Sequence, residues 1–235
     1  MSSKAQGIEM HEISLNPFKM HLTDAILSVH LAKEAQLGSA GAAHAIRAML
    51  CRTAVAHAVF ALESSANCFV ERLPRSKEFR EKAEMWPALE KFDFYLLSVP
   101  GAPKLPQDDK RVKATKDLIK LRDRHVHPRI VTYPVSQSET ADIRIQIKMP
   151  ETQTLNIPPF GWSIENAVTA INAVLDFLRL FSHITTIPAA GIRAILSDNM
   201  KCKDGTRVAD TGHYNKILTV SRTIGVDVEF LLESD

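Results

Sequence analysis

The 235-residue chain has few of the residues that define several classes of protein. Its three cysteines, Cys51, Cys68 and Cys202, include no Cys-x-x-Cys pair, so they signal neither a disulfide framework nor a structural zinc site. Nine glycines and 12 prolines are too few for a collagen-like or low-complexity chain. With 45% hydrophobic and 24% charged residues, the composition indicates a globular protein of one elaborated domain.

A long uncharged apolar run is also missing from the pattern. The longest apolar stretch, residues 45–62, is interrupted by Arg47, Arg52 and His57, whereas a membrane helix needs about 20 nearly uncharged residues. The first residues, Met-Ser-Ser-Lys-Ala-Gln, carry no apolar signal-peptide segment behind them. We therefore expect a cytoplasmic protein with no membrane partner.

Charge is balanced overall but not along the chain. The net charge of +2 argues neither for nor against nucleic acid. Between residues 104 and 129, however, nine basic and four acidic residues leave an excess of five positive charges. This segment is where we expect an anionic partner to bind.

Hydrophobic periodicity predicts a mainly α protein, an up-and-down bundle of about five helices with short connections. Asn16 and Pro17 suit a first helix start, Ser76 and Ser163 suit later starts, and Asp108 or Asp109 caps the helix that Pro128 ends. Pro87 either kinks the third helix or opens a new one. The helices are expected over about 17–38, 39–72, 77–96, 109–127 and 163–184.

The bundle is expected to span residues 16–185 and to carry a small β-hairpin insertion at about 130–158. Residues 130–135 form one expected strand, and alternation of Ile143, Ile145 and Ile147 with polar residues predicts its partner. Residues 186–235 are expected to form a C-terminal α+β extension packed on the bundle, with a short helix near 189–196. This extension holds no convergent set of acid, base and cation, so we expect it to be dispensable for chemistry.

One charged residue breaks the apolar stripe of the basic helix. Arg122 continues the stripe of Val112, Thr115 and Ile119, which aims a permanent charge at the interior or at an interface. His127 lies about 140° away on an ideal helix. Because a residue before proline leaves the helical region, Pro128 frees His127 to swing toward Arg122.

Residues 122–127, Arg-Asp-Arg-His-Val-His, resemble the motif of the HEPN (higher eukaryotes and prokaryotes nucleotide-binding) superfamily. That motif is an arginine, a neighbouring Asn, Asp or His, and a histidine after four to six residues, at the C-terminal end of a bundle helix. The resemblance covers roughly residues 18–185. It implies a metal-independent endoribonuclease active as a homodimer, with Arg122 and His127 as the catalytic pair and Asp123 as an orienting or dimer-site residue.

Other residues would support this site. Glu63 and Asn67 are polar residues on the Phe60 stripe of the second helix, and they are similar to the Glu-and-Asn pattern of the family. We expect Glu63 to approach Arg122. The alternative is a buried hydrogen-bonded pair of Glu63 and Asn67. His125 is a candidate for contact with the substrate phosphate. The candidates for RNA backbone contacts are Lys113, Lys116, Lys120, Arg124 and Arg129. A solvated helix face explains these basic residues equally well.

Several alternatives remain open from the sequence. Arg122 and His127 are also consistent with a structural pair, and His125-x-His127 with a metal pair, but no third ligand follows from the spacing; we expect neither metal nor cofactor. Arg129 stands where one HEPN subgroup, partnered with nucleotidyltransferases, has a modified tyrosine. The competing functions are an RNA-cleaving toxin or defence effector, with an antitoxin or regulatory protein as partner, a non-catalytic HEPN module that binds nucleotide, RNA or protein, and a purely structural dimer.

Overall fold

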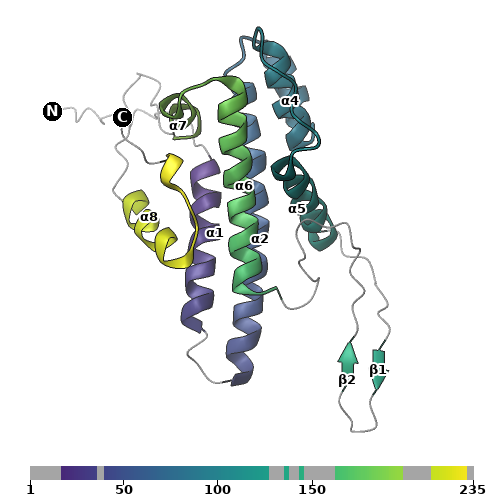
Figure 1. Ribbon diagram of the computed structural model, residues 1–235, viewed down its shortest axis with the longest axis vertical. Helices are drawn as coiled ribbons and strands as arrows, with labels where there is room; N and C mark the ends of the chain where they lie inside the picture. The colour runs from purple at the N-terminus through teal and green to yellow at the C-terminus, as the bar shows by residue number, and fades with distance from the viewer. Residues whose placement is uncertain are drawn as a thin grey trace, which may run out of the picture.

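The computed structural model describes residues 17–35, 40–126, 135–137, 143–145, 162–197 and 213–231. The described chain is mainly helical and forms a helical bundle (Figure 1). This agrees with the mainly α class that the periodicity predicts.

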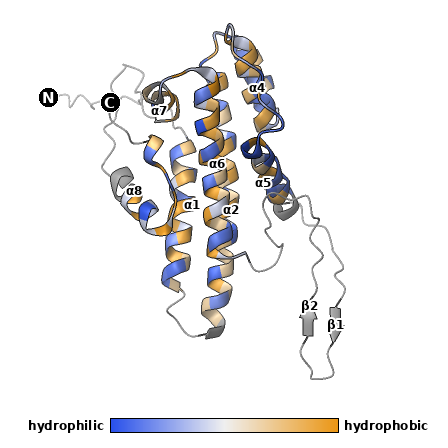
Figure 2. Ribbon diagram, viewed as in Figure 1, coloured by the Kyte–Doolittle hydropathy of each residue, from blue (hydrophilic) through white to orange (hydrophobic). Residues whose placement is uncertain are grey.

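Three long helices form the centre of the bundle. They are α1 (Pro17–Glu34), α2 (Ala40–Glu71) and α6 (Ile164–Thr185), which lie side by side (Figure 1). Apolar residues recur along all three (Figure 2), and the buried side chains of α2 are largely small, among them Ala54, Ala58 and Ala61. Small side chains let neighbouring helix backbones approach closely, which places the core between these helices.

The helix starts follow from their capping residues. Ser76 caps α3 (Lys77–Glu84) by accepting a 3.3 Å hydrogen bond from the Phe79 amide. Pro87 opens a new helix, α4 (Ala88–Ser98), rather than kinking the old one. Ser163 and Asn166 form a capping box at the start of α6. The Asn166 amide donates to the Ser163 hydroxyl at 3.2 Å, and the Ser163 amide donates to the Asn166 side-chain oxygen at 3.0 Å.

The basic helix is α5 (Lys110–Val126), and Asp109 precedes it. The Asp109 carboxylate accepts a 2.8 Å hydrogen bond from the Arg111 amide and two more from the Arg111 guanidinium. These bonds hold the pKa of Asp109 at about 2, well below its ordinary value of 3.8. Of the two aspartates that the sequence offered as caps, Asp109 therefore fills the role.

Two short strands lie between α5 and α6. β1 (Val135–Gln137) pairs antiparallel with β2 (Ile143–Ile145), with Val135 opposite Ile145. β2 falls within the predicted 143–147 strand. β1 begins where the predicted 130–135 strand ends, and residues 130–134 lie outside the described residues.

The C-terminal segment contributes to the same core. It contains α7 (Ala189–Ser197), α8 (His213–Ile224) and a short 3-10 turn at Glu229–Leu231. Asp227 forms a 2.6 Å ion pair with Arg179 of α6. The buried apolar residues of this segment, which join the core cluster, are Ile192, Leu196, Ile224, Val226, Val228 and Leu231.

Two helices are long and apolar enough to cross a membrane by length and composition, α2 over residues 42–71 and α6. For α2 this differs from the sequence expectation, because residues 53–70, just beyond Arg52, carry Glu63 as their sole Asp, Glu, Lys or Arg. Core helices of bundles share this composition, and 61% of the α6 window is buried inside the protein.

Candidate functional site

Arg122 lies in the last turns of α5 and is held by two carboxylates. Its guanidinium forms an ion pair with Glu63 of α2, and a second one of 3.1 Å with the neighbouring Asp123. The Arg122 side chain is 18% exposed and that of Glu63 is 33% exposed, so the pair lies at the boundary between interior and solvent. The predicted approach of Glu63 to Arg122 is confirmed as a contact.

The burial of α5 explains this boundary position. Its buried side chains are Val112, Thr115, Leu118 and Leu121, whereas Arg122 is half-buried. The stripe therefore turns toward Leu118 and Leu121 rather than running through Ile119 to Arg122, as the sequence suggested. Arg122 sits beside the buried face, close enough to α2 to reach Glu63.

An aromatic ring completes the surroundings of Arg122. The guanidinium carbon lies 5.8 Å from the centre of the Phe60 ring of α2, within the range of a cation–π contact. The Nε atom of Arg122 is buried and has no hydrogen-bond partner in the described part of the chain. The carboxylates and the ring thus fix the plane of the guanidinium, while the buried Nε–H is unused in the described part of the chain.

Asn67 does not join this group. Its side-chain oxygen accepts a 2.7 Å hydrogen bond from the buried ammonium of Lys91 in α4, which also donates to the Glu84 carbonyl at 2.8 Å. The Glu63–Asn67 pair considered from the sequence is therefore replaced by two separate pairs. Lys91 was overlooked, although its position three residues after Ala88 and four before Tyr95 places it on the apolar stripe of α4.

The remaining motif residues are outside what the structure places. His127 and Arg129 lie outside the described residues, as do the side chains of Arg124 and His125. The pairing of Arg122 with His127 therefore stays a prediction, and so do the roles of all the motif residues.

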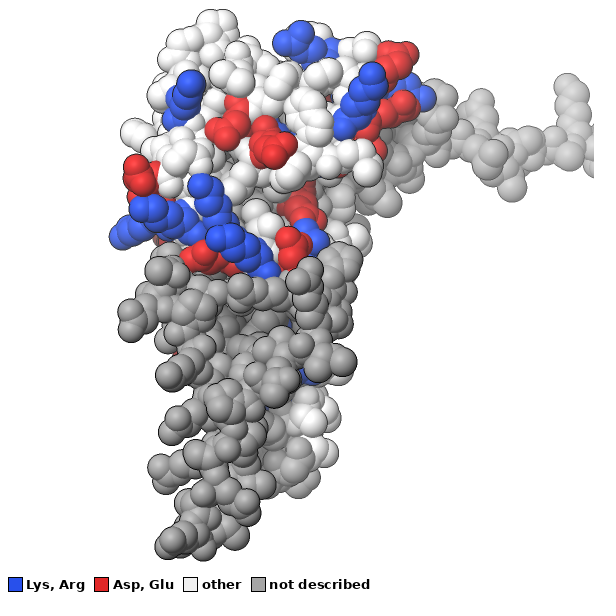
Figure 3. Space-filling view, turned by 90° about the vertical axis from the view of Figure 1, so that its right-hand side faces the viewer, with Lys and Arg blue, Asp and Glu red and all other residues white. Residues whose placement is uncertain are grey.

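The lysines expected to bind RNA lie on α5 among polar partners. Lys113 pairs with Asp108 at 3.4 Å, Lys116 donates to Gln107 at 2.6 Å, and Lys120 lies 3.8 Å from Asp117. On the face that includes α4 and α5, Lys and Arg side chains alternate with Asp and Glu (Figure 3). The solvated-face interpretation of this helix is therefore as well supported as an RNA-binding one.

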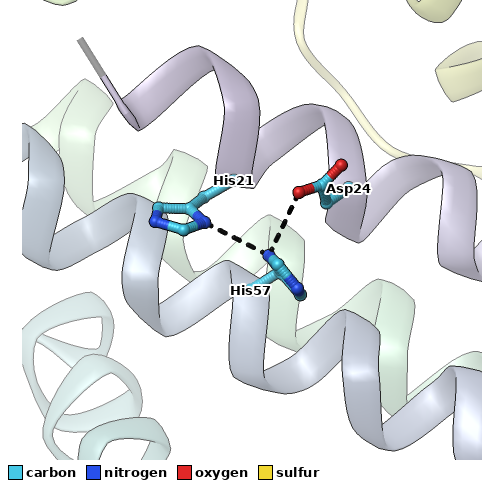
Figure 4. A group of neighbouring side chains, drawn as sticks. All are labelled: His21, Asp24 and His57. Carbon is cyan, nitrogen blue, oxygen red and sulfur yellow. Dashed lines mark hydrogen bonds and ion pairs between the residues drawn. The ribbon is translucent and has the colours of Figure 1, made fainter. Parts of the chain in front are cut away.

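A second polar cluster joins α1 to α2, and sequence reasoning did not find it. The Nδ1 atoms of His21 and His57 are 3.2 Å apart, and Nδ1 of His57 is 3.5 Å from Oδ2 of Asp24 (Figure 4). All three residues are half-buried, with one ligand atom from each within 4.8 Å of the others. Burial, with a smaller contribution from His57, lowers the pKa of His21, while Asp24 opposes the shift.

Phe60 lies against both clusters. Its ring centre is 5.4 Å from that of His21 and 5.9 Å from that of His57, on the same ring that Arg122 approaches. His57, Phe60 and Glu63 follow one another at steps of three residues on α2. The available sequence signal was His21-x-x-Asp24, a spacing that puts both side chains on one helix face.

In comparison with known proteins, no family model, no curated protein and no solved structure matches this chain. The residues and their geometry therefore carry the case for a function.

Proposed function

We propose that the chain is a metal-independent endoribonuclease in which Arg122 and His127 act on the RNA phosphodiester. One observation carries this most directly: Glu63 holds Arg122 at the C-terminal end of α5, five residues before His127. A guanidinium fixed in place can stabilise charge on a phosphate without first being ordered. The resemblance of residues 122–127 to the HEPN motif supplies the reaction class.

The chemistry needs an acid–base group and a cation. His127 takes the proton from the 2′-hydroxyl, whose oxygen attacks the phosphorus, and a protonated imidazole returns a proton to the leaving 5′-oxygen. Arg122 stabilises the negative charge that builds on the phosphate oxygens. Asp123, bound to the guanidinium at 3.1 Å, orients Arg122.

The wider proposal concerns architecture and location. Residues 16–185 form a HEPN-like bundle of about five helices with a hairpin insertion at about 130–158, and residues 186–235 pack on it. Two chains form a symmetric dimer with α5 near the two-fold axis, so that two copies of the motif share one cleft. The protein acts on RNA in the cytoplasm as a toxin or defence effector, under an antitoxin or regulatory protein.

A second candidate, a non-catalytic module that binds RNA, nucleotide or protein through the same residues, is favoured by one observation. The two terminal nitrogens of Arg122 already contact Glu63 and Asp123. A phosphate must then compete with two carboxylates for this cation. Such competition suits a weak binding site or a structural pair as well as a catalytic site.

The first experiment is incubation of the purified protein with a mixed RNA pool in EDTA, beside Arg122→Ala and His127→Ala. We expect the wild type to cut RNA and each variant to be slower by about 100- to 10,000-fold, the usual cost of losing an acid–base group. A DNA pool of the same sequences should stay intact, because DNA lacks the 2′-hydroxyl nucleophile.

The matched controls are His183→Ala, an exposed histidine of α6, and Lys77→Ala, an exposed cation of α3. Both should cut RNA within a few-fold of the wild type, and His125→Ala should fall between them and His127→Ala. Intact RNA in every lane, combined with RNA retention in a gel-shift assay that Glu63→Gln strengthens, would replace catalysis with the binding module.

The dimer is tested by sedimentation at micromolar concentration. A composite site requires a second copy, so we expect one species of twice the chain mass. Only monomer would exclude the shared cleft. Exposed apolar side chains on α1 and α2 are a second candidate contact between copies, namely Met20, Leu27, Leu31, Ile46 and Met49. Loss of the dimer in Leu31→Glu would assign the interface to them.

A further inference from the structure

We infer that His21, Asp24 and His57 form a binding site for one divalent transition-metal ion, with zinc as the best fit. The sequence led us to expect no metal, because no third ligand followed from the spacing around His125-x-His127. His21 and Asp24 are 33 or more residues from His57 and were not singled out. The fold brings them together where α1 packs along α2 (Figure 4).

The distances between the ligand atoms fit a tetrahedral ion. Zinc bonds of about 2.0–2.2 Å to nitrogen and oxygen require ligand atoms roughly 3.3–3.5 Å apart along the edges of a tetrahedron. The two Nδ1 atoms are 3.2 Å apart, and the Nδ1–Oδ2 distance from His57 to Asp24 is 3.5 Å. Two of the three edges therefore have the spacing of a metal site, and the ligand atoms of all three residues lie within 4.8 Å of one another.

The protons available in the cluster do not satisfy its atoms. A neutral imidazole carries one N–H, so a proton on Nδ1 of His57 must be shared between Asp24 and His21. If the proton is instead on Nδ1 of His21, a lone pair of His57 faces the carboxylate at 3.5 Å. A cation at the centre of the three atoms satisfies all of them at once.

The surroundings suit a metal more than a charged histidine pair. Metals bind the neutral imidazole, and both histidines turn Nδ1 into the cluster. The ring of Phe60 lies against both histidines and covers one side of the cluster. Two imidazoles and one carboxylate leave a fourth position for water, which is the ligand set of an open zinc site.

The consequence is a metal clip between α1 and α2. It is independent of the proposed function, because none of its ligands belongs to the motif at residues 122–127. Loss of the ion should lower the stability of the bundle and leave a reaction at Arg122 and His127 running in EDTA.

The experiment titrates zinc chloride into the chelator-treated full chain by calorimetry and repeats the titration with cobalt while recording visible absorption. We expect one ion per chain and the intense absorption bands of four-coordinate cobalt. His57→Gln and Asp24→Asn should each weaken zinc binding by more than about 100-fold, the upper end of the cost of changing even an outer-shell group.

Two controls separate this site from other histidines. His183→Ala removes an exposed histidine of α6, and the double variant His125→Ala/His127→Ala removes the H-x-H pair; both should bind zinc like the wild type. At 100-fold zinc over its dissociation constant, the wild-type Tm should rise by about 5–10 °C and that of His57→Gln by no more than about 1–2 °C. Circular dichroism shows whether His57→Gln is folded. The inference would be overturned if folded His57→Gln bound zinc as tightly as the wild type, or if the H-x-H double variant lost zinc binding.

Discussion

Two cations of the bundle, the half-buried Arg122 and the buried Lys91, have partners of different kinds. Arg122 is paired with the carboxylates of Glu63 and Asp123, whereas Lys91 donates to the neutral oxygens of Asn67 and the Glu84 backbone. Burial accordingly lowers the pKa of Lys91, with the charge of Glu84 opposing the shift. The charge of Arg122 therefore meets two carboxylates, whereas the charge of Lys91 meets two neutral oxygens.

The cap of α5 gives a prediction at the scale of one residue. Asp109→Ala removes the hydrogen bond to the Arg111 amide and should lower the free energy of unfolding by about 1 kcal/mol at pH 7. The pKa of Asp109 is lowered in the folded state, so its stabilisation is present above its ordinary value of 3.8 and is lost as the pH falls through about 2. Urea denaturation from pH 7 to pH 2 measures the difference.

Two neighbouring variants control this measurement. Asp108→Ala changes a fully exposed carboxylate and should shift the free energy of unfolding by less than about 0.5 kcal/mol. Asp109→Asn keeps a capping oxygen but has no charge to lose, so its stability relative to Asp109→Ala should not depend on pH. A difference between wild type and Asp109→Ala that stays constant down to pH 2 would contradict the role of the carboxylate.

At the scale of helices, the sequence predicted elements whose ends carry local signals. Ser76, Pro87 and Ser163 act through contacts within a few residues, so the starts of α3, α4 and α6 followed from composition and spacing. The helix α8 was missed because polar residues interrupt its apolar ones. Among its described side chains, Ile217 and Val220 are half-buried, and Ser221 and Ile224 are buried. The burial of α8 depends on its packing against the other helices and not on its own sequence pattern.

The same distinction holds for the candidate site. Glu63 could be matched with Arg122 because each breaks an apolar stripe of its own helix. The cluster of His21, Asp24 and His57 depends on how far α1 is shifted along α2, which no periodicity encodes. Helix packing, rather than helix formation, was the information that the sequence did not provide.

Close packing of α2 gives the prediction at this scale. Ala58 is 1% exposed in the core, so Ala58→Leu adds three carbon atoms where there is no space for them. We expect a loss of about 1–3 kcal/mol in the free energy of unfolding, measured by guanidinium denaturation.

Ala45→Leu provides the comparison on the same helix. Ala45 is exposed, and the free energy of unfolding should change by no more than about 0.5 kcal/mol. Equal free energies of unfolding for Ala58→Leu and Ala45→Leu would contradict the prediction. The helices around α2 would then be less closely packed than the burial of the α2 alanines indicates.

At the scale of the whole molecule, the C-terminal segment is part of the core and not an addition to it. Ile224, Val226 and Val228 are buried in the same cluster as the residues of α1, α2 and α6. The Arg179 guanidinium also donates to the Asp227 carbonyl at 2.9 Å. We expected residues 186–235 to be dispensable for chemistry, but cutting them away would uncover the core, so point substitutions are the suitable test.

The variant Ile224→Ala measures how much the C-terminal segment stabilises the bundle. Removing a buried isoleucine side chain costs about 2–5 kcal/mol, which for a chain of this size lowers the Tm by at least about 4 °C. Thr223→Ala, at the exposed neighbouring position, should leave the Tm nearly unchanged. Thermal unfolding is followed by circular dichroism, which reports the helix content of the whole chain. An unchanged Tm in Ile224→Ala would show that α8 does not stabilise the bundle.

The ring of Phe60, which lies against both polar clusters, has a consequence for how chain length can vary. One residue inserted into α2 turns everything beyond it by about 100°. An insertion between Phe60 and Glu63 would therefore take Glu63 away from Arg122, and one between His57 and Phe60 would take the ring away from His21. Chains of different length that keep both clusters must place their insertions elsewhere, for example in the connection at residues 99–106. The spacing of His57, Phe60 and Glu63 is thus a single structural unit, within which an added residue separates one cluster from the other.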